Sequence, residues 1–190
     1  ESMRIRPADL ADIEHILSLD HSYLTNHVWQ MSTPAGSGQS GLAELGASEH
    51  SVTFRLARLP RQVQTPYPHD SHTLRRIMHR CDYVWVALGD NASDLLGYIG
   101  LALVPWQSTA WVPCLAVAPA HRRRGIASQL LQTAIAQARA DGLHSITVDV
   151  QTKNYPATRL CQTRGFRLAG YSDNYYSASD IALFFAYRIR

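Results

Sequence analysis

The most constraining feature of this chain is an apolar segment that runs through a basic glycine turn into an amphipathic stretch. Residues 111–117 are apolar and predict a buried strand, which Pro119 ends. Residues 122–127, Arg-Arg-Arg-Gly-Ile-Ala, form a short basic turn. A helix is predicted next, because apolar residues recur at helical spacing: Ile126, Leu130, Leu131, Ala134, Ile135 and Ala138.

The start of a helix after a tight turn is a suitable place for an anion. The first helical turn has backbone N–H groups without helical partners, and the helix dipole adds partial positive charge. Gly125 has no Cβ, so the backbone can approach a ligand closely. The guanidinium groups of Arg122, Arg123 and Arg124 suit a pyrophosphate. We therefore predict a phosphate-binding turn; the alternative is a basic helix start on an ordinary surface.

A second motif occupies residues 154–166, Asn-Tyr-Pro-Ala-Thr-Arg-Leu-Cys-Gln-Thr-Arg-Gly-Phe. Residues 145–150 before it alternate between apolar and polar side chains, which predicts a strand. Asn154 is placed to cap the helix that follows, and its amide can also bind a ligand. Gly165 is placed as the left-handed residue that ends this helix, and Phe166 opens the next strand.

The pattern Arg122-x-x-Gly125-x-Ala127 resembles the acetyl-coenzyme A motif of the GNAT superfamily of N-acetyltransferases, and residues 154–166 resemble the pattern that follows it in that family. The resemblance covers residues 83–190 and extends to residues 3–20. From residue 148 onward the chain is most similar to the streptothricin acetyltransferase branch. The resemblance implies an α/β fold: a central mixed, mostly antiparallel sheet of six to seven strands, splayed between the fourth and fifth strands and flanked by helices.

The resemblance also implies which residues bind the coenzyme. The backbone around Leu115 holds the pantetheine arm, and one N–H there is the donor to the thioester oxygen in the transition state. The diphosphate lies on the basic turn, and Asn154 binds the pantetheine. The predicted coenzyme-binding residues are Leu115, Ala116, Val117, Arg122, Arg123, Arg124, Gly125, Ile126, Ala127, Asn154, Ala157 and Leu160.

The chain departs from the family at two catalytic positions. Pro113-Cys114 stands where many members have a Glu, and Cys161 stands where many have a Tyr as general acid. Cys161 is either a proton donor or a small core residue. Asp149 is the nearest ionisable candidate for a base or an amine anchor, because Val148 and Val150 beside it are apolar and should face the other side of the sheet. The alternative for Asp149 is a solvent-facing charge.

Composition favours one domain over residues 1–190 and argues against several other classes. The formal charge is +3, and no basic block exists beyond the turn, so we expect no nucleic-acid partner. Three scattered cysteines, Cys81, Cys114 and Cys161, indicate reduced thiols of a cytoplasmic protein rather than disulfides or a zinc site. Neither a signal segment nor a membrane span is expected.

Residues 27–80 exceed what the family's core needs, and we expect this insertion-like segment to shape the acceptor pocket; an inert insertion or a homodimer contact are the alternatives. Within it, residues 32–49 predict a flexible loop, residues 52–59 a strand and residues 71–80 a short helix. Residues 36–41, Gly-Ser-Gly-Gln-Ser-Gly, match the dinucleotide-binding fingerprint. They do not clearly follow a buried strand, so we interpret them as part of the flexible loop. We interpret His69, Asp70, His72 and His79 as solvated residues rather than as a metal site.

The predicted function is direct acetyl transfer from acetyl-coenzyme A to a primary amine of a small molecule, with an antibiotic or a polyamine-like compound as the acceptor. The acceptor must be neutral to attack the thioester, so a base or a desolvating pocket is required. Transfer to a protein or peptide amine and a non-catalytic acyl-coenzyme A sensor remain open. An RNA-binding module is disfavoured, because the basic turn lacks interleaved aromatic residues.

Overall fold

The computed structural model describes residues 3–33, 51–91, 94–177 and 179–189. The Gly36–Gly41 pattern and most of the loop expected at residues 32–49 lie outside these ranges. Two short 3₁₀ turns, Pro105–Gln107 and Pro119–His121, flank β6. In chain order the helices and strands are β1 (Arg4–Pro7), α1 (Leu10–Ser18), β2 (Tyr23–Ser32), β3 (Thr53–Thr65), α2 (Ser71–His79), β4 (Tyr83–Leu88), β5 (Leu95–Val104), β6 (Thr109–Val117), α3 (Ile126–Ala140), β7 (Ser145–Gln151), α4 (Tyr155–Thr163), β8 (Arg167–Ser172) and β9 (Ala182–Arg188).

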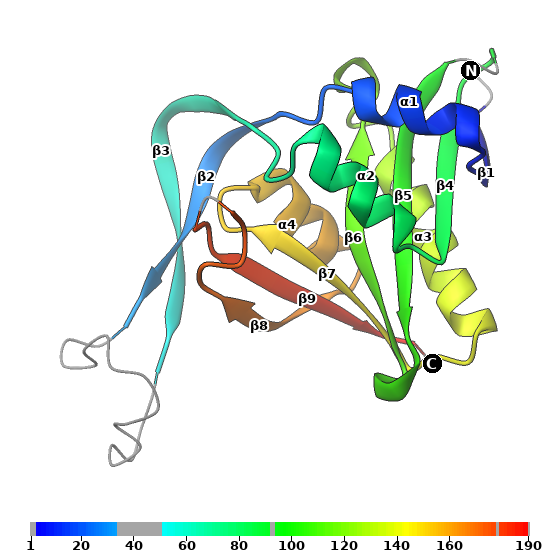
Figure 1. Ribbon diagram of the computed structural model, residues 1–190. Helices are drawn as coiled ribbons and strands as arrows, with labels where there is room; N and C mark the ends of the chain where they lie inside the picture. The colour runs from blue at the N-terminus through cyan, green and yellow to red at the C-terminus, as the bar shows by residue number, and fades with distance from the viewer. Residues whose placement is uncertain (1–2, 34–50, 92–93, 178, 190) are drawn as a thin grey trace.

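A seven-stranded sheet in the order β1-β4-β5-β6-β7-β9-β8 forms the body of the protein. Every neighbouring pair is antiparallel except β6 and β7, which are parallel. Helices α1 and α2 cover one face of the β4–β6 region, and α3 covers the other (Figure 1). The mixed, mostly antiparallel sheet predicted from the sequence is therefore confirmed.

Two apolar cores fill the layers on either side of the sheet. The core on the α3 side includes Leu130, Ile146 and Phe185. The core under α1 and α2 includes Ile16, Leu74 and, from the sheet, the fully buried Tyr98. The helical spacing of apolar residues thus fixes which face each helix buries.

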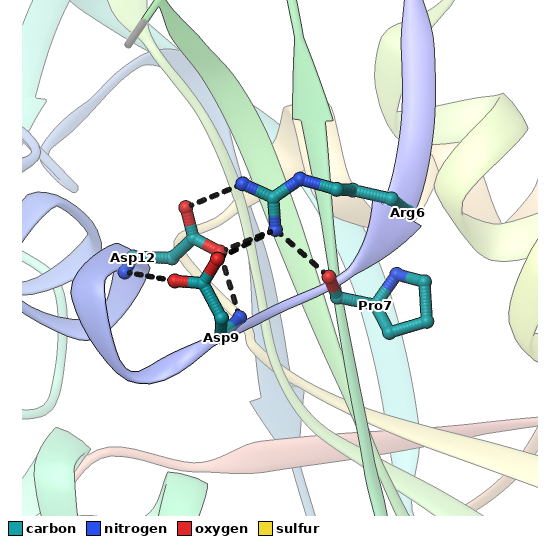
Figure 2. A network of polar contacts seen from close by, with 4 residues as sticks. All are labelled: Arg6, Pro7, Asp9 and Asp12. Atoms are coloured by element: carbon teal, nitrogen blue, oxygen red, sulfur yellow. Dashed lines mark hydrogen bonds and ion pairs between the residues drawn. The ribbon is translucent and has the colours of Figure 1, made fainter. Parts of the chain in front are cut away.

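The junction between β1 and α1 is held by a polar network around Asp12 (Figure 2). Asp9 is the N-cap, and it exchanges hydrogen bonds with Asp12 in a capping box. Two guanidinium nitrogens of Arg6 donate to the two oxygens of Asp12, at 2.6 and 3.0 Å. Burial opposes the charge on Asp12, but the bonds from Arg6 and Asp9 prevail and lower its pKa below the ordinary value.

Strands β2 and β3 form a separate antiparallel ribbon that the sequence only partly revealed. Residues 27–31, for which no element is expected from the sequence, belong to β2. The strand expected at residues 52–59 continues through Pro60 to Thr65. His27 pairs with Arg58 but Thr25 pairs with Val63, so β3 carries extra residues between these points. Pro60 lies in this irregular stretch, where its missing N–H costs no ladder bond.

The β2–β3 ribbon lies beside α4, and β2 contacts this helix (Figure 1). The backbone N–H of Trp29 donates to the carbonyl of Thr152 at 3.0 Å, and its indole N–H donates to Oγ1 of Thr158 at 3.3 Å. The hydroxyl of Tyr23 donates to Oε1 of Gln151 at 2.8 Å. Residues 23–32 are therefore tied to the β7–α4 connection.

Candidate active site

The parallel strands β6 and β7 pair over only part of their length. The ladder runs from Thr109 opposite Ser145 to Val112 opposite Val148 and ends there. Figure 1 shows the two strands meeting at their lower ends and spreading apart above. They are the fourth and fifth strands in the order of the sheet, so the predicted splay is found where it was expected.

Strand β6 carries a bulge where the split begins. Cys114 pairs with Gly100 of β5 and Trp111 pairs with Ala102, so Val112 and Pro113 together stand opposite one residue. A bulge is one of the few places where a sheet accepts proline, because no N–H is required of it. Pro113 thus occupies the kind of position that its chemistry predicts.

A cavity occupies the split between β6 and β7. Helix α4, the segment before α2 and the loop between β8 and β9 complete its wall. It brings together several residues predicted from the sequence: Leu115, Asp149, Asn154, Ala157, Leu160 and Cys161. Ala116 and Val117 continue β6 beyond this cavity, and residues 122–127 form the turn that follows.

Two residues of the turn between β6 and α3 have left-handed backbone conformations, Arg123 with φ of 67° and Gly125 with φ of 84°. A Cβ added to Gly125 would meet no heavy atom within 4 Å, so the glycine meets a conformational requirement and leaves open space beside the backbone. Ile126 then begins α3. The N–H groups of the first turn of α3 therefore face the region beside Gly125.

The side chain of Arg122 holds this turn in place. Its Nε donates to the carbonyl of Val117 at 2.8 Å, and its Nη2 donates to the carbonyl of Asp20 at 3.2 Å. The guanidinium thereby ties the end of β6 to the connection between α1 and β2. The side chains of Arg123 and Arg124 are exposed beside it.

Asn154 is the N-cap of α4, as predicted. Its Oδ1 accepts a hydrogen bond from the N–H of Ala157 at 3.1 Å, while the residue also lines the cavity. The amide nitrogen of Asn154 takes no part in this cap. At the other end of the helix, Gly165 has φ of 84° and acts as the left-handed residue predicted there.

Asp149 lies on β7 beside the split, partly buried and bonded through both carboxylate oxygens. The indole N–H of Trp111 donates to Oδ1 at 2.5 Å, and the hydroxyl of Tyr176 donates to Oδ2 at 2.8 Å. Val148 and Val150 face the apolar core on the other side, as predicted from alternation. Burial raises the pKa of Asp149, while the bonds from Tyr176 and Trp111 oppose that rise.

The split sheet, the glycine turn and the capped α4 occur together in a known family. The family model of the acetyltransferase (GNAT) family matches residues 52–166, more than half of the chain. This protein belongs to the GNAT family. The sequence resemblance is thereby confirmed, and so is the fold that it implied.

Proteins similar to this chain include a streptothricin acetyltransferase and a nourseothricin acetyltransferase. Streptothricin acetyltransferase of Streptomyces lavendulae is 28% identical over 95 residues, which are 50% of each protein, so the alignment spans about half the length of this curated relative. A crystal structure of nourseothricin acetyltransferase superposes with a TM-score of 0.81 at 23% identity, covering 100% of both chains. A Bacillus anthracis protein assigned as a streptothricin acetyltransferase, solved with acetyl coenzyme A, gives 0.72 at 17% identity, covering 98% of this chain and 99% of that one.

The cysteine that replaces the family's tyrosine is part of the apolar core. Cys161 is 2% exposed and packs among the residues between α4 and the sheet. Burial raises its pKa to about 12, so the thiol is a poor proton donor to a leaving thiolate whose own pKa is ordinary. The geometry favours the packing role among the two that the sequence left open.

Tyr67 and His69, from the segment before α2, line the cavity without having been expected there, whereas Tyr176 follows β8 and was a candidate for the pocket. The ring of His69 contacts those of Tyr67 and Tyr176, with centroids 5.6 and 5.8 Å apart. The interpretation of His69 as a solvated residue was wrong, because it is half-buried in the wall of the cavity. The only local signal is the alternation of Pro66 and Pro68 around Tyr67, which stiffens the chain just before α2.

The histidines beside His69 have other surroundings. Asp70 caps α2 by accepting from the N–H of Thr73, and His72 and His79 are exposed. Within the ranges that the structure describes, no cluster of His, Cys, Asp or Glu could hold a metal ion. In those same ranges no helix is both long and apolar enough to cross a membrane.

Proposed function

We propose that this protein transfers an acetyl group from acetyl-coenzyme A directly to a primary amine of a small molecule. The observation that supports this most is the cavity in the β6–β7 split, because one wall carries backbone groups of β6 and the other carries Asp149. A thioester entering from the glycine turn and an amine entering from the α2 side would meet there.

The coenzyme is proposed to lie along β6 with its diphosphate on the turn. The backbone of Leu115, Ala116 and Val117 would hydrogen-bond the pantetheine. The N–H groups of residues 123–127 would bind the diphosphate, helped by the exposed Arg123 and Arg124. Arg122 would act by holding the turn, since its guanidinium is already bonded to two carbonyl oxygens.

Helix α4 is proposed to close the other side of the pantetheine tunnel. Asn154, Ala157 and Leu160 line the cavity along this helix. The amide nitrogen of Asn154, which the cap does not use, would donate to the pantetheine. Small and apolar side chains at the other two positions leave room for a thin, weakly polar chain.

The reaction needs a donor for the oxygen of the tetrahedral intermediate. A backbone N–H near Leu115 would serve, because the bulge at Val112 and Pro113 turns this part of β6 toward the split. Asp149 would hold the acceptor as an ammonium ion. Its two hydrogen bonds fix the carboxylate in place, and a fixed charge in a partly buried site attracts a cation strongly.

A small amine is the acceptor class that we infer. The wall around Asp149 is built from aromatic rings, and aromatic faces attract cations. The names of the relatives point the same way, since streptothricin and nourseothricin acetyltransferases are named for small antibiotics. Three free thiols fit the reducing cytoplasm as the place of action.

A non-catalytic sensor of acyl-coenzyme A is the second candidate, favoured by Cys161, which replaces the family's tyrosine and has a raised pKa. One experiment separates the two. The protein is incubated with acetyl-coenzyme A and a panel of small amines and peptides, and free thiol is followed with time. Turnover that favours small diamines or an aminated antibiotic supports the proposal. Calorimetric binding of the coenzyme without turnover on any amine supports the sensor. A preference for peptide N-termini would show that the acceptor is a peptide rather than a small amine.

A further inference from the structure

Among the described residues that line the cavity, His69 is the one imidazole, and no motif in the sequence selects it. It lies one residue before the cap of α2, between the rings of Tyr67 and Tyr176. Within the described part of the chain, neither of its ring nitrogens makes a hydrogen bond. A half-buried imidazole with uncommitted nitrogens, in the wall of a cavity that also holds the carboxylate of Asp149, is a candidate for proton transfer.

The other titratable groups around the cavity are less suited to take a proton. Both oxygens of Asp149 accept hydrogen bonds already. His21, behind Tyr67, has one nitrogen on the carbonyl of Leu19 and the other on the hydroxyl of Tyr98. Burial holds the pKa of Cys161 at about 12, and a hydrogen bond with Cys81 together with burial raises that of Cys114.

We propose that His69 is the general base of the reaction: it takes the proton from the acceptor ammonium that Asp149 holds, and so makes the nucleophile. This inference rests on the proposed acetyl transfer and adds a catalytic residue to it. Asp149 and His69 then have separate tasks, one binding the cation and the other removing its proton.

The electrostatic surroundings of His69 suit this task. Burial lowers the pKa of its imidazole, and the neighbouring Asp70 opposes that shift. The groups that face or flank the ring are Tyr67 from its own segment, Asp70 and His72 at the start of α2, Cys114 on β6, and Tyr176 and Asp149 across the cavity. A neutral imidazole at pH 7 can accept a proton that a charged one cannot.

The proton and electron balance is complete without a further reagent. The ammonium gives its first proton to His69, which passes it to solvent. The freed lone pair forms the N–C bond, and the thioester oxygen gains negative charge. When the C–S bond breaks, its electrons leave with the coenzyme's sulfur, and the second proton of the nitrogen ends on that sulfur. The products are the amide, free coenzyme A and one proton.

The test compares His69→Gln with His72→Gln, which changes an exposed histidine three residues away on α2. Steady-state kinetics are measured from pH 6 to pH 9.5 with the best small amine, and coenzyme affinity by calorimetry. We expect His69→Gln to lower kcat/KM about 100-fold at pH 7, the low end for loss of a general base. Coenzyme affinity and the amine's KM should change little, because His69 acts on the proton and not on binding.

The pH profile separates a catalytic role from a structural one. For His69→Gln, log kcat/KM should rise with a slope near one up to pH 9.5, because only amine already neutral in solution reacts, and its pKa is about 10. The original protein and His72→Gln should stay flat above pH 7. If His69→Gln keeps the original profile and rate, the inference is overturned while the proposed function stands. If the unaltered protein acetylates no amine, both the proposed function and the role of His69 are contradicted.

Discussion

The indole N–H of Trp111 on β6 bonds Oδ1 of Asp149 on β7, just beyond the last pair of the ladder that joins the two strands. One hydrogen bond therefore spans the split at its base. Tyr176 bonds the other oxygen from the loop between β8 and β9. The carboxylate is fixed by three parts of the chain that come together only in the folded protein.

Replacing Asp149 by Asn should reduce activity without reducing stability. Burial raises the pKa of Asp149, so ionising this carboxyl destabilises the folded state. The destabilisation is absent below the pKa of Asp in the unfolded chain, about 3.9, and is present at pH 7. Asp149→Asn removes this destabilisation along with the charge that holds an ammonium. We expect kcat/KM for the amine to fall at least about 10-fold, while the melting temperature at pH 7 stays level or rises. A lower melting temperature with unchanged kinetics would contradict this.

Replacing Cys161 by Ala should affect packing more than rate. The thiol is buried in the core, and a group with a pKa of about 12 is a weak acid for the leaving thiolate. We expect stability to fall by about 1 kcal/mol and kcat to fall much less than the about 100-fold that loss of a general acid causes. Denaturant unfolding and steady-state kinetics measure both. A large loss of kcat at unchanged stability would instead make Cys161 the acid.

Asp12 is expected to stabilise the β1–α1 junction in a pH-dependent way. The bonds from Arg6 and Asp9 lower its pKa, so its stabilisation is present above the unfolded value of about 3.9 and is lost as pH falls through the folded pKa. Asp12→Asn should lower the melting temperature by several degrees at pH 7. The difference in melting temperature between Asp12→Asn and the original protein should disappear toward pH 2. A difference in melting temperature that does not change with pH would show that the charge of Asp12 does not cause the stabilisation.

Gly97 keeps β5 and β6 close together where β6 leads into the turn. A Cβ there would lie 2.7 Å from the carbonyl oxygen of Ala116 and 3.2 Å from Cα of Val117, both backbone atoms. Gly97→Ala should cost about 1–3 kcal/mol and weaken coenzyme binding, because β6 must shift. Gly170→Ala is the control, since its nearest contact, Cδ2 of Phe184, is 3.8 Å away. Equal effects of the two changes on unfolding would exclude the steric cause.

Local chemistry predicted several backbone features around the cavity. The left-handed Gly165, the cap at Asn154 and the bulge at Pro113 each follow from what that residue's own backbone or side chain allows. Such requirements are visible in a few neighbouring residues. These local features of β6 and α4 were therefore predictable.

The opposite side of the cavity was less predictable, because its contacts join distant segments. Strand β2 is fixed by bonds from Tyr23 and Trp29 to residues more than a hundred positions later. His69 meets Tyr176 from a loop near the other end of the chain. No periodicity or turn signal near His69 indicates this partner. The sequence alone therefore favoured a solvent-exposed side chain for His69.

The central claim is that backbone around Gly125 binds the diphosphate, and one calorimetric comparison tests it most directly. Gly125→Glu adds a side chain and a negative charge at the start of α3; Gly142→Glu does the same just past the end of α3, at a residue with φ of 71° and no heavy atom within 4 Å of its added Cβ. We expect acetyl-coenzyme A to bind the first variant at least about 100-fold more weakly, about 2.7 kcal/mol, and the second like the original protein. Unchanged affinity in a folded Gly125→Glu protein would contradict the account.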